Sequence, residues 1–211
     1  MRESHKRIFE EVKKELDEDG SGHDAQHVKR VYNQAMSIAE EEGGDKDVIG
    51  AAALTHDIHR VMGDSFTHPA DSIHRIGEVL DRAGYEGNIH EVFYCVAVHE
   101  EYGFEEGNGE NYSLEAEIVQ DADNLDAMGA VGIGRTFKFG GAHGNPMWVP
   151  EEDLDRDEYD KQNMDDSTIQ HFYDKLLSLK DNMNTDTAQQ KAEERHQFME
   201  EFVERFKEEW K

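Results

Sequence analysis

Apolar residues recur at intervals of three and four along most of this chain, which is the spacing of one face of an α-helix. Val28, Val31 and Ile38, for example, share a face of a segment that begins near His27 and stops at Gly43. The pattern predicts helices at about residues 2–17, 27–42, 46–61, 69–83, 88–99, 113–128, 166–183 and 187–210.

Glycine-rich and acidic stretches separate these helices. Residues 103–111 and 151–166 are predicted to be surface loops, and the glycines of 129–150 predict a short helix followed by an active-site loop. There is no alternating strand pattern and no internal repeat. A chain of 211 residues suits one sizeable core and is short for two domains. We therefore predict an all-α, single-domain helical bundle.

The charge of the chain is extreme, because 22 basic residues stand against 49 acidic ones and give a net charge of −27. Such a field repels phosphates, which argues against a nucleic-acid duplex or an anionic membrane surface as a partner. Self-repulsion destabilises a compact state at low salt, and molar salt screens it. We interpret the composition as halophilic, an adaptation to a salt-rich cytoplasm, and draw nothing from it about the substrate.

Cysteine usage and the N-terminus are consistent with a cytoplasmic protein. The lone Cys95 lies in an apolar run and is expected to be a small buried hydrophobic residue rather than a nucleophile. The first residues are charged and lack the apolar core of a signal peptide, and no run reaches the length of a membrane span.

The candidate chemistry lies in His27, the adjacent pair His56-Asp57, and Asp123. Two imidazoles and two carboxylates suit a divalent metal ion. The pair follows an apolar helical run, where burial without a partner is costly. Each residue has an ordinary alternative: His27 as a helix-start side chain, and His56 as a core histidine bonded to a carboxylate.

The fourth residue is less certain on spacing alone. Asp121, Asp123 and Asp126 lie in one helical segment, and Asp121 and Asp123 point about 200° apart on a helix. Asp123 and Asp126 share a face, and either could turn inward.

These residues and their surroundings resemble the HD superfamily of metal-dependent phosphohydrolases, within it a subgroup of small bacterial and archaeal proteins. The resemblance covers about residues 20–210. It rests on the following stretches: Gly22-His23-Asp24 with His27, Leu54 to Ile58, Gln120 to Ala127, Gly132 to Phe137 with Gly140-Gly141, and Lys180 to Thr185. It implies an HD-type bundle over 1–211, with a metal core at about 20–130 completed by C-terminal helices at about 131–211. It also implies a metal held by His27, His56, Asp57 and Asp123.

The resemblance also suggests residues around the metal. His99 is a candidate for phosphate binding, proton transfer or a second metal, and Arg135 for a phosphate clamp, each against an ordinary polar role. His23 and Asp24 are candidates for orienting the first ligand. This chain departs from many members by having His59-Arg60 where they have glycine. His59 could line the site, support its ligands from outside or lie at the surface, and Arg60 could meet a substrate phosphate or be a helix-end cation that binds carbonyl groups.

The function that the resemblance implies is metal-dependent hydrolysis of a small phosphorylated compound, such as a nucleotide, with His99, Arg135 and Asp57 as the catalytic candidates. The ion is open among Mn, Mg, Ni, Co, Fe and Zn. One alternative is a dinuclear iron oxygenase completed by some of His59, His68, His74, His90 and His99; another is a non-catalytic nucleotide sensor. An aromatic stripe along 198–210 indicates core or a homodimer contact.

The acidic composition predicts stabilisation by salt. Because the Debye length falls to about 3 Å at molar salt, surface repulsion is screened there. We expect the melting temperature to rise between low and molar potassium chloride, measured by circular dichroism. A melting temperature that does not rise would contradict the halophilic interpretation.

Overall fold

The computed structural model describes residues 1–16, 22–62, 68–101, 112–150 and 167–210. These residues form α-helices and short 3-10 helices (η1–η3) without any strand, so the predicted all-α class is confirmed. They separate into two compact units, Met1–Asp123 and Asn124–Lys211. The predicted loops at 103–111 and 151–166 lie outside the described residues. The prediction of a single domain over 1–211 stays a prediction.

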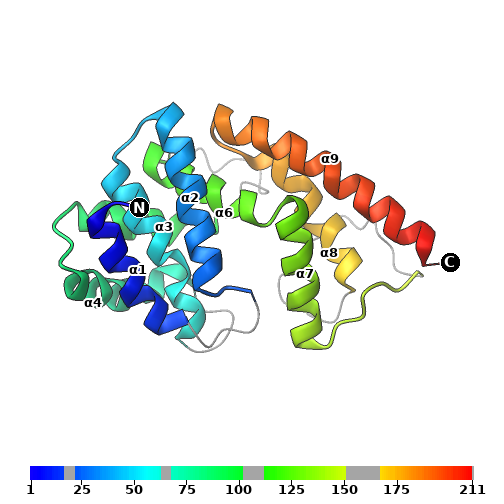
Figure 1. Cartoon of the computed structure of the whole chain (residues 1–211), viewed down its shortest axis with the longest axis horizontal. Coiled ribbons are helices and arrows are strands. Elements are labelled where there is room, and N and C mark those ends of the chain that lie inside the picture. Colours follow the sequence, from blue (N-terminus) through cyan, green and yellow to red (C-terminus); the bar gives the residue numbers. More distant parts are fainter. Residues whose placement is uncertain (17–21, 63–67, 102–111, 151–166, 211) are drawn as a thin grey trace. The chain divides into compact units, whose positions relative to one another are not determined.

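The first unit is built from the helices in the blue-to-green part of Figure 1. In chain order they are α1 (Glu3–Leu16), α2 (Ala25–Glu42), α3 (Lys46–Thr55), η1 (His56–Val61), η2 (Pro69–Ser72), α4 (Ile73–Ala83), α5 (Ile89–Val98) and most of α6 (Leu114–Asp126). The helices predicted at 2–17, 27–42 and 69–83 are thus confirmed, with η2 forming the first turn of the last.

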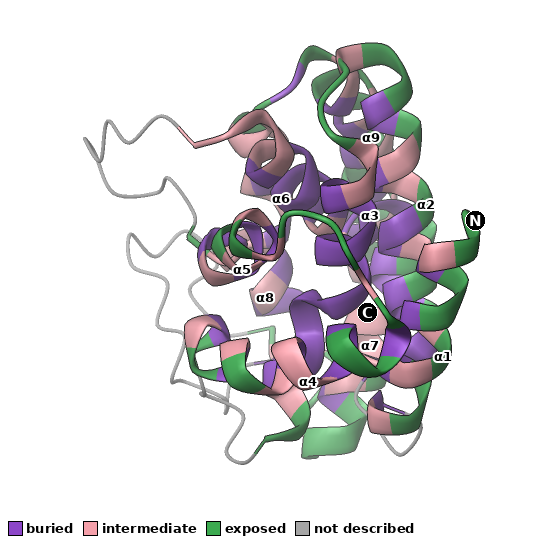
Figure 2. Ribbon diagram, turned by 90° about the vertical axis from the view of Figure 1, so that its left-hand side faces the viewer, coloured by how far each residue is buried: buried purple, intermediate pink, exposed green. Residues whose placement is uncertain are grey.

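Helix α3 is the centre of this unit. It packs against α1, α2 and α5, and every residue from Val48 to Thr55 is buried, as the purple ribbon of Figure 2 shows. The run Gly50 to Ala53 makes this possible, because small side chains let neighbouring helices approach closely. At Gly50 the imidazole of His5 occupies the space where a side chain would begin. The small residues of α3 therefore fix how close the surrounding helices come.

The prediction of one continuous helix over 46–61 was wrong. The α-helix ends at Thr55, and His56-Asp57 begin the 3-10 helix η1. A 3-10 helix has about three residues per turn, so side chains three apart lie above one another. This local change sets the directions of the histidine and aspartate side chains.

The second unit contains the end of α6 followed by α7 (Gly129–His143), α8 (Thr168–Asp174), η3 (Leu176–Asn182) and α9 (Asp186–Glu209). The long helix predicted at 166–183 was wrong, since α8 and η3 divide it. In the aromatic stripe of α9, Phe202 stacks on Phe172 while Phe198 is exposed, so only part of the stripe is core. The homodimer contact stays a prediction.

The active-site loop predicted within 129–150 was also wrong, because most of this segment is the helix α7. Two of its glycines serve close packing rather than a loop. A side chain at Gly132 would overlap the carbonyl oxygen of Ala127, and one at Gly140 would overlap the hydroxyl of Thr168. Only glycine fits at these two positions, and in the sequence such glycines cannot be told from those of a loop.

Two further expectations concern Cys95 and membrane-spanning helices. Cys95 is fully buried, and burial raises the pKa of its thiol, as expected for a small hydrophobic residue. None of the helices in the described part of the chain combines the length and the hydrophobicity needed to cross a membrane.

The contact between Gly50 and His5 predicts a substitution effect. Gly50→Ala should force the imidazole out of its place and destabilise the protein by roughly 1–3 kcal/mol, measured by urea unfolding. Gly77→Ala in α4 is the matched control, since its new methyl group would meet only Phe93, at 3.5 Å. This control should be neutral or stabilise by up to about 1 kcal/mol. Equal effects of the two substitutions would contradict the packing argument.

Candidate metal centre

Two helix junctions bring the predicted ligands together. His27 lies in the first turn of α2, and Asp24 caps this helix by accepting from the backbone N–H groups of Gln26 and His27. His56 and Asp57 open η1 directly after α3. Asp123 reaches the same place from α6. Local capping and a change of helix type thus aim side chains from three segments at one point.

The distances at this point are short. Nε2 of His27 lies 3.1 Å from Nε2 of His56, 3.1 Å from Oδ2 of Asp57 and 3.4 Å from Oδ1 of Asp123. Nε2 of His56 lies 3.6 Å and 3.7 Å from the same two carboxylate oxygens. The structure therefore brings all four predicted ligands together, although their role as ligands stays a prediction.

The hydrogen bond of the His56 imidazole leaves a nitrogen lone pair directed at the centre. Nδ1 of His56 donates to the carbonyl oxygen of Ala53, so Nε2 carries the lone pair of the neutral ring. Burial lowers the pKa of His56 to about 4, so the ring is neutral at pH 7. Two imidazole nitrogens and two carboxylate oxygens in contact repel one another unless a cation or a proton lies among them. This donor set fits a divalent transition-metal ion.

The two carboxylates are ionised at neutral pH. Burial alone would raise the pKa of Asp57, but the histidines around it, His56 and His23 foremost, outweigh burial and hold that pKa well below its usual range. Burial acts on Asp123 in the same direction, and His56 and His27 likewise lower its pKa overall. Both side chains are therefore in the form that binds a metal.

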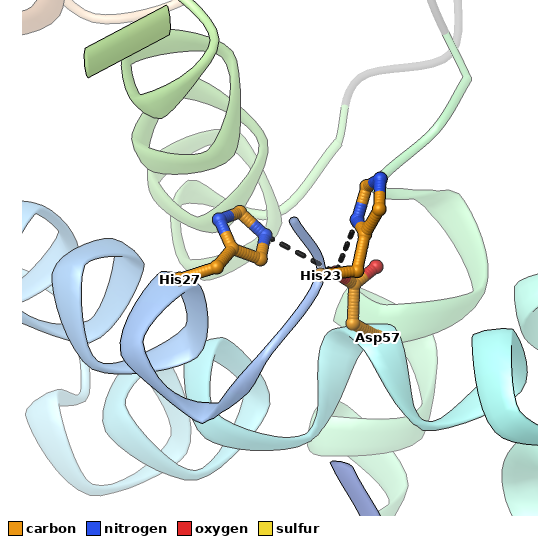
Figure 3. Close-up of side chains that lie close together, drawn as sticks. All are labelled: His23, His27 and Asp57. Atoms are coloured by element: carbon orange, nitrogen blue, oxygen red, sulfur yellow. Dashed lines mark hydrogen bonds and ion pairs between the residues drawn. The ribbon is translucent and has the colours of Figure 1, made fainter. Parts of the chain in front are cut away.

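His23 is closer to the centre than the sequence suggested. Figure 3 shows His23 and His27 both directed at Asp57. Nδ1 of His23 lies 2.8 Å from Oδ2 of Asp57, and His23, His27 and Asp57 could hold an ion together. Its side chain is 23% exposed, whereas that of His27 is fully buried, so His23 borders the open side of the centre. The pattern around His27 indicated an orienting role only.

His99 lies on another side of the same group. Its ring centroid is 5.2 Å from that of His56, and His56, Asp57 and His99 form a further set of possible ligands. Nδ1 of His99 donates to the carbonyl of Val96, while its buried Nε2 has no hydrogen-bond partner among the described residues. An orphaned imidazole nitrogen beside the ligands is an available base, donor or ligand.

His59 and Arg60 both contact residues of the candidate centre. His59 is buried, and its Nδ1 donates to the carbonyl of His56. The guanidinium of Arg60 contacts the carboxylates of Asp57 and Glu100. Glu100 was missed from the sequence; its position directly after His99 at the end of α5 was the available signal.

The remaining candidates are Arg135 and three further histidines. Arg135 is in α7 of the second unit, where its Nη1 donates to the buried carboxylate of Asp126 at 2.9 Å. Its role as a phosphate clamp stays a prediction. His68, His74 and His90 are exposed, and His68 caps η2 through the N–H of Ala70. Of the five extra histidines, only His59 and His99 are buried beside the candidate ligands.

Comparisons with known proteins agree with this geometry. Residues 24–128 match the HD domain family model. The chain is 38% identical over 192 residues to the uncharacterised protein YpgQ of Bacillus subtilis, covering 89% of this chain and 84% of that protein.

The chain belongs to the HD-domain family. A crystal structure of an HD-superfamily hydrolase from Bacillus thuringiensis is similar to this HD protein with a TM-score of 0.72 and 37% identity, covering 98% of this chain and 96% of that one. A structure of Bacillus subtilis YpgQ in complex with ADP is similar with a TM-score of 0.71 and 32% identity, each chain covered to 97%. HD domains bind divalent metals, which the donor set of this chain fits.

The cap at Asp24 generates a prediction about metal affinity. Asp24→Ala should cost about 0.5–2 kcal/mol of stability through the lost cap. Because the cap also positions His27, the substitution should weaken Mn²⁺ binding by about tenfold. Both quantities can be measured by thermal unfolding of the metal-free protein and by Mn²⁺ titration calorimetry.

Asp45→Ala is the matched control, because Asp45 caps α3 by accepting from the N–H of Asp47, at the end remote from His56. It should cost similar stability without changing Mn²⁺ affinity. Wild-type Mn²⁺ affinity in Asp24→Ala would mean that the cap does not position His27.

Proposed function

We propose that this protein is a metal-dependent phosphohydrolase that acts on a small phosphorylated compound, and that this compound is a nucleotide. The observation that carries the proposal is the convergence of two imidazoles and two carboxylates at the junction of α3 and η1. Each imidazole Nε2 lies 3.1–3.7 Å from the other Nε2 and from one oxygen of each carboxylate. The complex of the related YpgQ with ADP supports a nucleotide as the ligand class.

His27, His56, Asp57 and Asp123 would hold the ion. A divalent ion bound by four protein groups lowers the pKa of a water and neutralises charge on a phosphoryl oxygen. The partly exposed side chains of Asp123 and His23 mark the side from which substrate would approach. The side chains of His27 and His56 are fully buried.

His99 is the residue assigned to proton transfer. The bond from Nδ1 to Val96 fixes the ring, so Nε2 is the atom that takes up or gives a proton. When protonated, this nitrogen would donate to the leaving oxygen and complete bond cleavage. The mechanism assigns no step to Arg135, because its Nη1 is engaged by Asp126.

A phosphate-release screen tests the proposal. Nucleotides and phosphomonoesters should be offered with several divalent ions at high salt, since salt screens the repulsion between an anionic substrate and this acidic protein. His56→Ala and Asp57→Ala should each lower turnover by at least about 100-fold, because loss of outer-sphere partners alone costs 10–100-fold. Both variants should also lose retained metal.

His74→Ala is the control, since this imidazole on α4 is 89% exposed. Its turnover should equal that of the wild type. Full activity in either His56→Ala or Asp57→Ala would falsify the proposed site. Nucleotide binding by the wild type without turnover under any metal would favour the sensor function instead.

A second candidate function rests on the buried Nε2 of His99, which has no hydrogen-bond partner among the described residues. Together with His56 and Asp57 this nitrogen could serve a second ion, as a dinuclear iron oxygenase requires. Iron at about two per chain with oxygen-dependent turnover would favour this function. Turnover that continues without oxygen would argue against it.

A further inference from the structure

The carboxylate of Asp57 is contacted on both of its oxygens. Oδ2 faces the histidines, at 2.8 Å from His23 and 3.1 Å from His27. Oδ1 instead lies 3.5 Å from Nε of Arg60. The two oxygens therefore differ in environment, one directed at the candidate metal centre and the other at a guanidinium.

The 3-10 geometry of η1 brings Arg60 to this position. Asp57 and Arg60 are three residues apart, and in a 3-10 helix side chains with this spacing lie one above the other. In an α-helix the same two side chains would be offset by about 60° around the axis. The change of helix type at Thr55 thus places a cation over the metal-facing aspartate.

Glu100 holds Arg60 from a different element. Nη2 of Arg60 donates to Oε1 of Glu100, which follows the end of α5, and the same oxygen lies 3.6 Å from Nε2 of His59. Burial alone would raise the pKa of Glu100, but His59 and the charge of Arg60 outweigh it and hold that pKa below its usual range. Glu100 is therefore an anion that ties Arg60 to α5.

We propose that Arg60 is a positioning residue for Asp57 and that Glu100 acts through Arg60. This inference rests on the metal centre proposed above. The terminal torsion of an aspartate has a broad, two-fold preference, so its oxygens exchange places easily. A guanidinium held beside Oδ1 removes this freedom, presents Oδ2 alone to the metal, and compensates the charge of a carboxylate that is 2% exposed.

This positioning role differs from the binding of a substrate phosphate by Arg60. A guanidinium that meets two carboxylates is already compensated in charge, so it attracts a phosphate less than an uncompensated one does. Removal of Arg60 should therefore affect metal binding in the absence of any substrate.

The experiment measures Mn²⁺ affinity by calorimetry and the visible absorption of the Co²⁺ form, both without substrate. Arg60→Met should weaken Mn²⁺ binding by about 10–100-fold, as loss of an outer-sphere partner does, and should alter the Co²⁺ bands because the carboxylate can then bind through both oxygens. Arg60→Lys should restore only part of the affinity, since a lysine lacks the planar fork of arginine.

Glu100→Gln tests the second part of the proposal. It should weaken Mn²⁺ binding less than Arg60→Met does. The double variant should bind no more weakly than Arg60→Met alone, because Glu100 acts through Arg60. Additive effects of the two substitutions would overturn the role of Glu100.

Arg75→Met is the matched control. Arg75 forms a forked pair with Glu15 at 2.8–3.2 Å, which joins α4 to α1. Its loss should leave Mn²⁺ affinity and the Co²⁺ spectrum unchanged.

Wild-type affinity and spectrum in Arg60→Met would overturn the proposal for Arg60 without contradicting the proposed metal centre. If the wild type itself binds no Mn²⁺, the metal centre fails as well. Should Arg60→Met not fold, Arg60→Lys and Glu100→Gln decide the question.

Discussion

The buried carboxylate of Asp57 is the constraint on which the surrounding structure depends. An unpaired charge in a protein interior costs several kcal/mol, so it persists only where partners compensate it. Here the partners come from separate segments: His23 and His27 at the start of α2, His56 beside it, and Arg60 one 3-10 turn later. A group that is costly to bury becomes the point where these segments meet, and the same partners keep it in the ionised form that metal binding would require.

The small residues of α3 make this meeting possible. With glycine and alanines over residues 50–53, α1, α2 and α5 pack closely around α3. The end of α3 is then within reach of His27 on α2 and of His99 at the end of α5. The candidate site therefore lies at the end of a helix that is buried from Val48 to Thr55, and this packing fixes the positions of the candidate ligands.

Much of the fold and of the candidate ligand set could be predicted from the sequence. Apolar periodicity is a local property, so it located α1, α2, α4 and α9, and the motifs around His27, His56 and Asp123 indicated a metal centre. The glycines of α7 misled because flexibility and close packing require the same residue. Glu100 was missed because its position directly after His99 does not show that it contacts Arg60, 40 residues earlier in the chain.

The sequence by itself determined the all-α class, the helix faces and the chemical types of the candidate ligands, since these depend on residue identity and spacing along a short stretch of chain. Only the tertiary structure decided that α3 changes to a 3-10 helix at His56, that His23 reaches Asp57, and that Arg60 pairs with Glu100. These features arise from contacts between residues up to 40 positions apart, whose strength depends on burial and mutual distance.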